Sequence, residues 1–416
     1  MGLVCVLLLK RPYSSLVVMM RSNSSSVFLG LFASALSALP LGAAPATNAL
    51  KPGERARWDM DYGPFLNLTV QMPGETAGST PKGVAIRVGE SKEGTVAFDT
   101  DLMRCTGGWT GGFLDFKGVA FNGAHGGNPG PVGEVVFQTS AVPGWSKAGS
   151  FADPRALPRG FGASTIPYGP LPADWAKYKG LYRHGEKTVL SYTVGTAAVL
   201  EAPGLEGSGE GKVLTRTFNV RSAGAASTLL VAEVSPSAQW QEREGCLVVT
   251  EGAEKEDARL VLKVLGAPAS AKWVWIAPGR VGLELPAFAG GERWKVGHWR
   301  GKERNLSEAF AALGAMNPAQ DLAPWTRPGP ALWPEVISVK GEVGSEDGPF
   351  QLDTVSLPMQ NPWNSWLRLG GLDFFQDGRI AFSTLAGDVW VGKGVDDGLQ
   401  NIQWKRFAAG LHQPLG

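Results

Sequence analysis

Residues 65–101 read FLNLTVQMPGETAGSTPKGVAIRVGESKEGTVAFDTD and contain three short segments in which apolar and polar side chains alternate. The segments 65–71, 83–88 and 94–101 are each bounded by glycine or proline. Alternation with a period of two is typical of strands that bury one face, and Gly and Pro favour turns between them. This stretch therefore predicts short antiparallel strands joined by tight turns.

The same pattern continues along the chain, and helical signals are few. Strand spacing of about ten residues is typical of sandwiches and barrels. Helix is predicted only near 172–178 and 305–313. We therefore predict an all-β, mainly antiparallel fold with few short helices and a β-sandwich-like N-terminal region. The further predicted strands are 133–139, 187–194, 197–201, 213–220, 227–234, 246–250, 258–264 and 272–277.

The composition fits a folded, strand-rich protein with two or three domains. The 416 residues are 44% hydrophobic and 19% charged, with 56 Gly, 29 Pro and 15 Trp. The 39 Lys and Arg are balanced by 38 Asp and Glu. No basic surplus exists to bind a phosphate backbone, which argues against nucleic acid as a partner.

The first 46 residues have the pattern of a secretory signal peptide. They contain basic but no acidic residues, and an apolar run from 27 to 44 ends in Ala44-Pro45-Ala46. A small-x-small site after an apolar run is typical of cleavage. We expect an exported protein, periplasmic or extracellular, with no membrane span after cleavage. Translation could start at Met1, Met19 or Met20.

Cysteine and histidine usage predicts no metal site. Cys105 and Cys246 remain after cleavage, and both a disulfide and two buried thiols are compatible with the sequence. The four histidines are scattered, without the local spacing of a zinc site.

Two composition shifts predict boundaries. The stretch 317–346 is rich in proline and predicts a linker, or a strap on the preceding domain. The stretch 204–211 has the Gly, Glu and Ser of an exposed loop. We predict domains at 47–210, 211–346 and 347–416.

An ordered series of motifs in residues 55–345 resembles an uncharacterised bacterial domain family. That family occurs in exported proteins ahead of a β-propeller, often with a c-type cytochrome module, and the resemblance implies this architecture and a possible cytochrome partner. The family has no assigned activity. The motifs are MDYGP (60–64), FDTD (98–101), GGWTGGFLDF (107–116), FNGAHG (121–126), PYGPLP (167–172), WAKYKGLYRHG (175–185) and SYTVG (191–195).

The C-terminal sequence carries a second resemblance. GLDFFQDGRIAFSTLAGDVW (371–390) and WKRFAAGLHQPLG (404–416) resemble one propeller blade of the soluble glucose/sorbosone dehydrogenase type. Turns at 376–378 and 386–388 between alternating strands agree with that interpretation. Propellers close with four to eight blades, so we expect residues 347–416 to hold the first blade of a truncated propeller.

This second resemblance implies a quinoprotein-type sugar dehydrogenase as the full-length parent. PQQ and calcium would be cofactors of that parent, and the groups that bind them come from several blades. We therefore expect no cofactor in this chain and no catalysis of that reaction by it.

Candidate catalytic residues lie in the first region. Asp99 and Asp101 are two apart on a predicted strand and so about 7 Å apart on one face. With Asp115 they could form a carboxylate pair for glycoside hydrolysis or an oxygen cage for calcium, or they could accept backbone N–H bonds in the nearby turns. His184 could act as a base, or form a local hydrogen bond at the start of a strand.

Aromatic residues among Gly, Pro and Asp point to binding. Ring side chains on loops can stack on sugar faces while polar neighbours bind hydroxyls. Packing of irregular loops is the competing interpretation. The residues that we predict to bind a ligand are Trp109, Asp115, Tyr168, Trp175 and Tyr182.

Two functions are compatible with these observations. The chain is either the N-terminal part of an exported dehydrogenase-like propeller protein with a leading non-catalytic β domain, or it contains a self-contained carbohydrate-binding or carbohydrate-cleaving domain.

Overall fold

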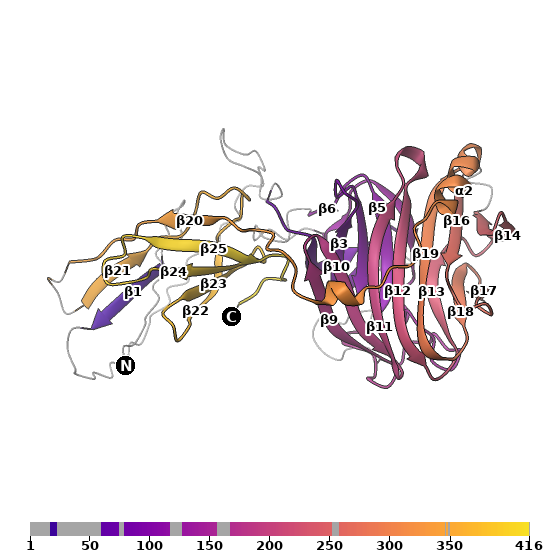
Figure 1. The fold of residues 1–416 in the computed structure, drawn as a ribbon, viewed down its shortest axis with the longest axis horizontal. Helices are drawn as coiled ribbons and strands as arrows, with labels where there is room; N and C mark the ends of the chain where they lie inside the picture. Colours follow the sequence, from indigo (N-terminus) through magenta and orange to yellow (C-terminus); the bar gives the residue numbers. More distant parts are fainter. Residues whose placement is uncertain are drawn as a thin grey trace, which may run out of the picture. The chain divides into compact units, whose positions relative to one another are not determined.

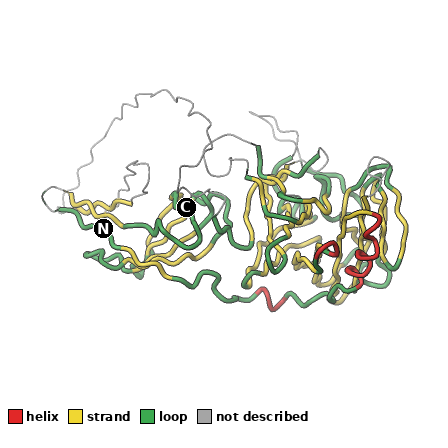
Figure 2. Tube along the Cα trace, turned by 90° about the horizontal axis from the view of Figure 1, so that it is seen from above, coloured by secondary structure: helices red, strands yellow, loops and turns green. Residues whose placement is uncertain are grey.

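The computed structural model describes residues 17–22, 60–74, 79–116, 127–155, 167–251, 258–345, 347 and 350–415. About 51% of the chain is strand and 6% helix, and the sheets are antiparallel. The all-β prediction is therefore confirmed, with few helical segments, drawn red in Figure 2. Most of the predicted signal peptide, the motif at 121–126 and Met1 lie outside the described residues.

The chain divides into two compact units. The sandwich unit comprises Tyr62–Leu332, and the terminal unit comprises Met1–Asp61 with Trp333–Gly416. None of the helices in the described part of the chain has the length and apolar character needed to cross a membrane.

One layer of the sandwich unit contains a five-stranded sheet whose first three strands lie within residues 65–99. Its order is β2-β3-β4-β5-β8. The predicted strands 65–71 and 83–88 are confirmed, with the second starting earlier at Ser79, and the predicted strand 94–101 ends at Asp99. The bounds are β2 (Phe65–Gln71), β3 (Ser79–Val88), β4 (Gly94–Asp99), β5 (Arg104–Thr110) and β8 (Glu134–Gln138), with a small pair β6 (Leu114–Asp115) and β7 (Gly130–Pro131) beside it.

The second layer is an eight-stranded sheet of order β14-β15-β16-β19-β12-β11-β10-β9 (Figure 1). It contains strands from both sides of residue 210, and the glycine-rich stretch 204–211 is the connection between two hydrogen-bonded neighbours, β11 and β12. The bounds are β9 (Ala176–His184), β10 (Lys187–Val194), β11 (Ala197–Glu206), β12 (Val213–Ala223), β14 (Gln239–Arg243), β15 (Cys246–Thr250), β16 (Ala258–Leu265) and β19 (Phe288–Lys302).

A three-stranded sheet of order β13-β18-β17 extends the first layer. Its strands are β13 (Ser227–Glu233), β18 (Arg280–Leu285) and β17 (Lys272–Ala277). An isolated bridge between Trp145 and Leu229 joins this sheet to the segment that follows β8. One apolar core spans all three sheets, with Phe98, Phe218 and Leu283 among its buried members.

Two elements cover the outer face of the eight-stranded sheet. Helix α2 (Leu306–Gly314) packs Phe310 and Leu313 against apolar residues of β12, β15, β16 and β19. The strap at 315–332, which includes the 3-10 turn η5 (Ala323–Thr326), inserts fully buried Leu322 against Val189 and Ala202. Short 3-10 turns η2 (Gly209–Gly211) and η4 (Glu303–Asn305) complete the unit.

The terminal unit holds a five-stranded sheet of order β20-β25-β24-β23-β22 and a two-stranded pair, β1 with β21. Strands β22 to β25 form an up-and-down meander around buried Phe382, Trp390 and Trp404. Strand β20 adds a fifth strand from outside the predicted blade. The bounds are β1 (Val17–Ser22), β20 (Val336–Val339), β21 (Phe350–Val355), β22 (Leu369–Phe374), β23 (Ile380–Thr384), β24 (Val389–Lys393) and β25 (Ile402–Ala408).

Arg406 of β25 joins the two points where the chain leaves and re-enters the terminal unit. Its Nη1 lies 3.2 Å from Asp61 Oδ2, its Nη2 donates to the Asp61 carbonyl, and its guanidinium lies 4.5 Å from the ring centroid of Trp333. Trp333 Nε1 also donates to Asp61 Oδ2 at 3.0 Å. The sandwich unit is therefore an insertion in the sequence of the terminal unit.

The strap provides a direct test of this packing. We expect Leu322→Ala to lower the free energy of unfolding of the sandwich unit by about 3 kcal/mol, because a fully buried leucine would leave a cavity. Gln320→Ala, which truncates an exposed side chain on the same strap, is the control. Calorimetry of the full chain measures both, and equal stability of the two variants would contradict the packing role.

Candidate ligand-binding pocket

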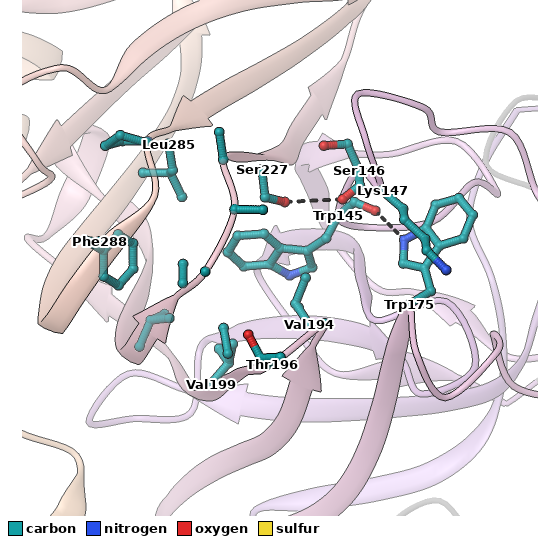
Figure 3. Close-up of a pocket in the computed structure, with 18 of the residues that line it drawn as sticks. Trp145, Ser146, Lys147, Trp175, Val194, Thr196, Val199, Ser227, Leu285 and Phe288 are labelled. Atoms are coloured by element: carbon teal, nitrogen blue, oxygen red, sulfur yellow. Dashed lines mark hydrogen bonds between the residues drawn. The ribbon is translucent and has the colours of Figure 1, made fainter.

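A cavity of about 370 Å³ opens at one end of the sandwich. Its walls are the segment 145–148, the hairpin turn between β10 and β11, the turn between β12 and β13, and the connection from β18 to β19. Asp174 and Trp175, just before β9, complete the lining, so five separate parts of the fold meet around one hollow (Figure 3).

Aromatic rings form much of the wall. Trp145, Trp175, Trp294 and Phe288 all line the cavity. Trp175 Nε1 donates to the carbonyl of Trp145 at 2.8 Å, and Trp294 stacks on Phe218 with centroids 5.4 Å apart. These contacts fix the orientation of the rings before any ligand arrives.

Polar groups are few and lie among these rings. Lys147 forms an ion pair with Asp174, and its Nζ lies 6.0 Å from the ring centroid of Trp175. The hydrogen bond and charge of Lys147 lower the pKa of Asp174, so this carboxylate stays ionised. Ser227 and Thr196 add hydroxyl groups to the lining, and Ser227 Oγ donates to the Ser146 carbonyl at 3.2 Å.

Small residues keep the cavity open. The turn between β12 and β13 reads AGAAS (223–227), so its side chains are too short to fill the space. In the β10–β11 turn, Gly195 has φ +54°, a conformation that most other residues disfavour. The hollow is therefore a consequence of the local sequence.

A buried polar chain leads from the pocket into the core. Trp145 Nε1 donates to Tyr192 Oη at 3.3 Å, Tyr192 donates to Glu201 Oε2 at 2.7 Å, and Arg216 Nε donates to Glu201 Oε1 at 2.6 Å. Burial and the Glu201 charge raise the pKa of Tyr192 well above its usual value, so the phenol keeps its proton. Burial by itself would lower the pKa of Arg216. The nearby Glu201 nevertheless holds the pKa of Arg216 above its ordinary value.

Of the residues predicted to bind a ligand, Trp175 lines the cavity and the other four do not. Trp109 is fully buried and donates its indole N–H to the Phe113 carbonyl at 2.7 Å. This agrees with the alternative that the ring packs an irregular part of the fold. Tyr168 is 54% exposed and Tyr182 43% exposed, while Asp115 is an exposed residue of β6.

The predicted catalytic residues also lie outside the cavity. Asp99 accepts the N–H groups of Asp101 and Leu102 at 3.0 and 3.1 Å and pairs with Arg104 at 3.2 Å. It caps a turn, the alternative that the sequence left open. Burial, and then the Asp99 charge, raise the pKa of Asp101. His184 Nδ1 lies 3.1 Å from the Arg327 carbonyl on the strap, a structural contact.

The sequence analysis missed Lys147, Asp174, Thr196 and Ser227. Lys147 and Asp174 are 27 positions apart and meet only in the fold. The run of small residues at 223–227 between two predicted strands was the available signal, because such a run cannot fill the space at the end of a sandwich.

A second cavity of about 490 Å³ lies where β8 approaches the end of β19. Arg300 on its wall is held on two sides: Nε donates to the Val136 carbonyl at 2.8 Å, and Nη1 pairs with Glu251 at 2.5 Å. Lys212 and Lys302 also line it, opposite acidic Glu134 and Glu210, so its charges balance.

Both cysteines are buried free thiols, which decides the alternative left open by the sequence. Burial raises the pKa of Cys105 to about 12, so this thiol is an inert part of the core. No group of three or more His, Cys, Asp or Glu side chains in the described ranges is arranged to hold a metal ion.

His298 makes the stability of the sandwich unit depend on pH. It is fully buried and stacks on Phe137 with centroids 3.9 Å apart. Burial, and then the Arg216 charge, lower its pKa from 6.5 to about 3. The folded protein therefore keeps His298 neutral, whereas the unfolded chain takes up a proton below about pH 6.5. The free energy of unfolding is therefore not reduced by His298 above about pH 6.5, and it decreases as the pH falls toward 3.

We expect this residue to lower the free energy of unfolding by about 1.4 kcal/mol per pH unit between about pH 6 and pH 4. In His298→Leu, which has no titratable group, the pH slope should be smaller by that amount. Denaturant unfolding at several pH values measures both slopes. Identical slopes for the two proteins would show that His298 does not control the acid sensitivity.

Comparison with known proteins gives limited similarity. Residues 96–201 match the family model described as Domain of unknown function (DUF6797). No curated protein matches the chain. Among solved structures, a mutant of a glycoside hydrolase of family 81 from Clostridium thermocellum is similar at 13% identity and a TM-score of 0.26. The match covers 78% of this chain and 35% of that chain. Residues 96–201 of this chain therefore resemble a family whose function is not known.

Proposed function

We propose that the sandwich unit is a non-catalytic module that binds a sugar-sized molecule in the pocket lined by Trp145 and Trp175. The observation that carries the proposal is the combination of fixed indole rings with a small number of polar groups around a 370 Å³ hollow. Ligand pockets of roughly 300–1,000 Å³ are mostly apolar, with a few polar groups that orient the ligand.

A mono- or disaccharide has the matching chemistry. One face of a pyranose ring is apolar and stacks on an aromatic ring, while its hydroxyl groups need donors and acceptors around the edge. Lys147 supplies donors, Asp174 an ionised acceptor, and Thr196 and Ser227 groups that do both. This retains the carbohydrate ligand predicted from the sequence, but moves the site to other residues.

The same lining argues against hydrolysis in this pocket. Cleavage of a glycosidic bond generally uses two carboxyl groups, one of them protonated. Among the described residues that line the cavity, Asp174 is the single carboxylate, and Lys147 holds its pKa down. A group that stays ionised cannot protonate a leaving group, so binding fits this site better than cleavage.

Export stays a prediction from the signal-peptide pattern, and the propeller and the dehydrogenase relationship stay predictions from the sequence resemblance. The up-and-down meander of β22 to β25 has the strand order that a blade needs. PQQ, calcium and a cytochrome module would belong to a longer parent, and a binding module ahead of a sugar dehydrogenase could hold substrate near it.

The binding site can be tested by filling it. Thr196 is exposed in the β10–β11 turn and lines the cavity, so Thr196→Trp should occlude it without removing core atoms. We expect at least about a tenfold loss of saccharide affinity, about 1.4 kcal/mol, with an unchanged melting temperature. Ala198→Trp is the matched control, because Ala198 is exposed on the adjacent strand but outside the lining.

The measurement is a glycan array on the full chain, followed by calorimetric titration of the saccharides that bind. Absence of binding to any mono- or disaccharide would reject the proposed ligand class. Saccharide binding that Thr196→Trp leaves unchanged would place the site elsewhere.

A further inference from the structure

The edge strands of the sandwich unit differ in how they are protected. An edge strand presents unpaired N–H and C=O groups, and proteins commonly protect such edges with charged side chains or bulges. Strand β9 carries exposed Lys177 and Lys179. Strand β14 carries exposed Glu242 and Arg243. Both strands therefore have the features that discourage pairing with another chain.

Strand β17 carries less charge than these two strands, although its pairing with β18 has a register shift between Trp275 and Ala277. Its sequence is KWVWIA (272–277), with one charge, at its first residue, followed by five half-buried apolar side chains. In the described part of the chain, β18 is its only strand neighbour. Figure 1 shows β17 at the margin of the sandwich unit, near β14. An apolar edge of this kind is a template for adding a strand.

The register assigns each side chain of β17 to a face. Trp273 lies opposite Leu283 and Trp275 opposite Val281, and both partners belong to the core, so the two indoles lie on the core face. Val274 lies opposite Gly282 and so on the outer face. Trp240 of β14 contacts Trp275 edge-to-face at 5.9 Å, which fixes the edge of the core at this strand.

We propose that β17 pairs with β17 of a second copy of this chain, antiparallel, about a two-fold axis at Val274. This axis is perpendicular to the sheet, so the core faces of both copies lie on the same side of the joined sheet. Residues opposite each other in the two β17 strands must therefore point to the same face. Val274 then faces Val274 of the second copy, and Trp273 faces Trp275 of the second copy, twice by symmetry. The two three-stranded sheets become one sheet of six.

The sequence of β17 favours a second copy over an unrelated extended peptide. Cross-strand pairs of aromatic residues and pairs of β-branched residues are both favourable, and the symmetric register produces only these at its centre. Lys272 is held away from the centre, in an ion pair with Glu284 of β18 at 3.1 Å. Because a six-residue edge buries little surface, the dimer should be weak and concentration-dependent.

The symmetric register permits a charge-swap test with the full chain. Val274→Lys places two ammonium groups directly opposite each other, and Val274→Asp does the same with two carboxylates. We expect sedimentation velocity to show a concentration-dependent dimer for the wild type and at least about a tenfold weaker dimer for each variant alone. Mixing the two variants should restore dimers, because residue 274 of one copy then faces the opposite charge.

Val274→Thr keeps a β-branched side chain without charge and should dimerise like the wild type. Circular dichroism and melting temperature confirm that each variant is folded, which is expected because Val274 is a half-buried residue of the outer face. A wild type that stays monomeric at the highest concentration would reject the proposal. Dimers that survive in both charged variants, or a mixture that does not restore them, would reject the β17 register.

Discussion

The ion pair between Glu201 and Arg216 is the interaction on which the proposed binding site depends. Both side chains are fully buried between the layers of the sandwich. Arg216 Nε donates to Glu201 Oε1 and the guanidinium lies 5.0 Å from the ring centroid of Phe218, while Nη1 and Nη2 have no hydrogen-bond partner in the part of the molecule that the structure describes. Glu201 uses its second oxygen to accept from Tyr192, and Tyr192 accepts from Trp145. The requirement to satisfy one charge in the core therefore sets the orientation of an indole at the pocket wall. The pocket is rigid because its wall belongs to the same hydrogen-bonded chain as the core.

The two places where the sandwich leaves apolar surface incompletely covered differ in geometry. At the end of the sandwich, short residues in the 223–227 turn leave a concave space between the layers, which suits a small molecule. At the side, the outer backbone edge of β17 has no neighbour among the strands that the structure describes, which suits another strand. Tryptophan is prominent at both because a large, rigid ring covers core residues while part of it stays available for contact.

The fold was more predictable from the sequence than the site, for a physical reason. Alternation at 65–71, 83–88 and 94–99 is a local property, and the sheet retained it. The direction in which an aromatic ring of a glycine-rich stretch points is not a local property of the sequence. Trp109 is buried and donates its indole N–H to the Phe113 carbonyl, whereas Trp175 lines the pocket and donates to the Trp145 carbonyl. Lys147 and Asp174 could not have been paired from spacing alone.

The insertion of one unit within the sequence of the other could not be predicted either, because it depends on contacts between residues far apart in the sequence. A sequence read from one end to the other suggests successive domains, but Asp61 and Trp333 both contact Arg406, far apart in the sequence. Arg406 also forms an ion pair with Asp388 at 2.7 Å, so one buried guanidinium links the meander to both ends of the inserted unit. Burial raises the pKa of Asp388 although Arg406 opposes that shift, so this carboxylate relies on Arg406 for its charge. Loss of Arg406 would therefore leave the Asp388 carboxyl group buried without its ionic partner and remove the contacts of Arg406 with Asp61 and Trp333. The direct hydrogen bond from Trp333 Nε1 to Asp61 Oδ2 would still join the two connections, so Arg406 and Trp333 together hold them side by side.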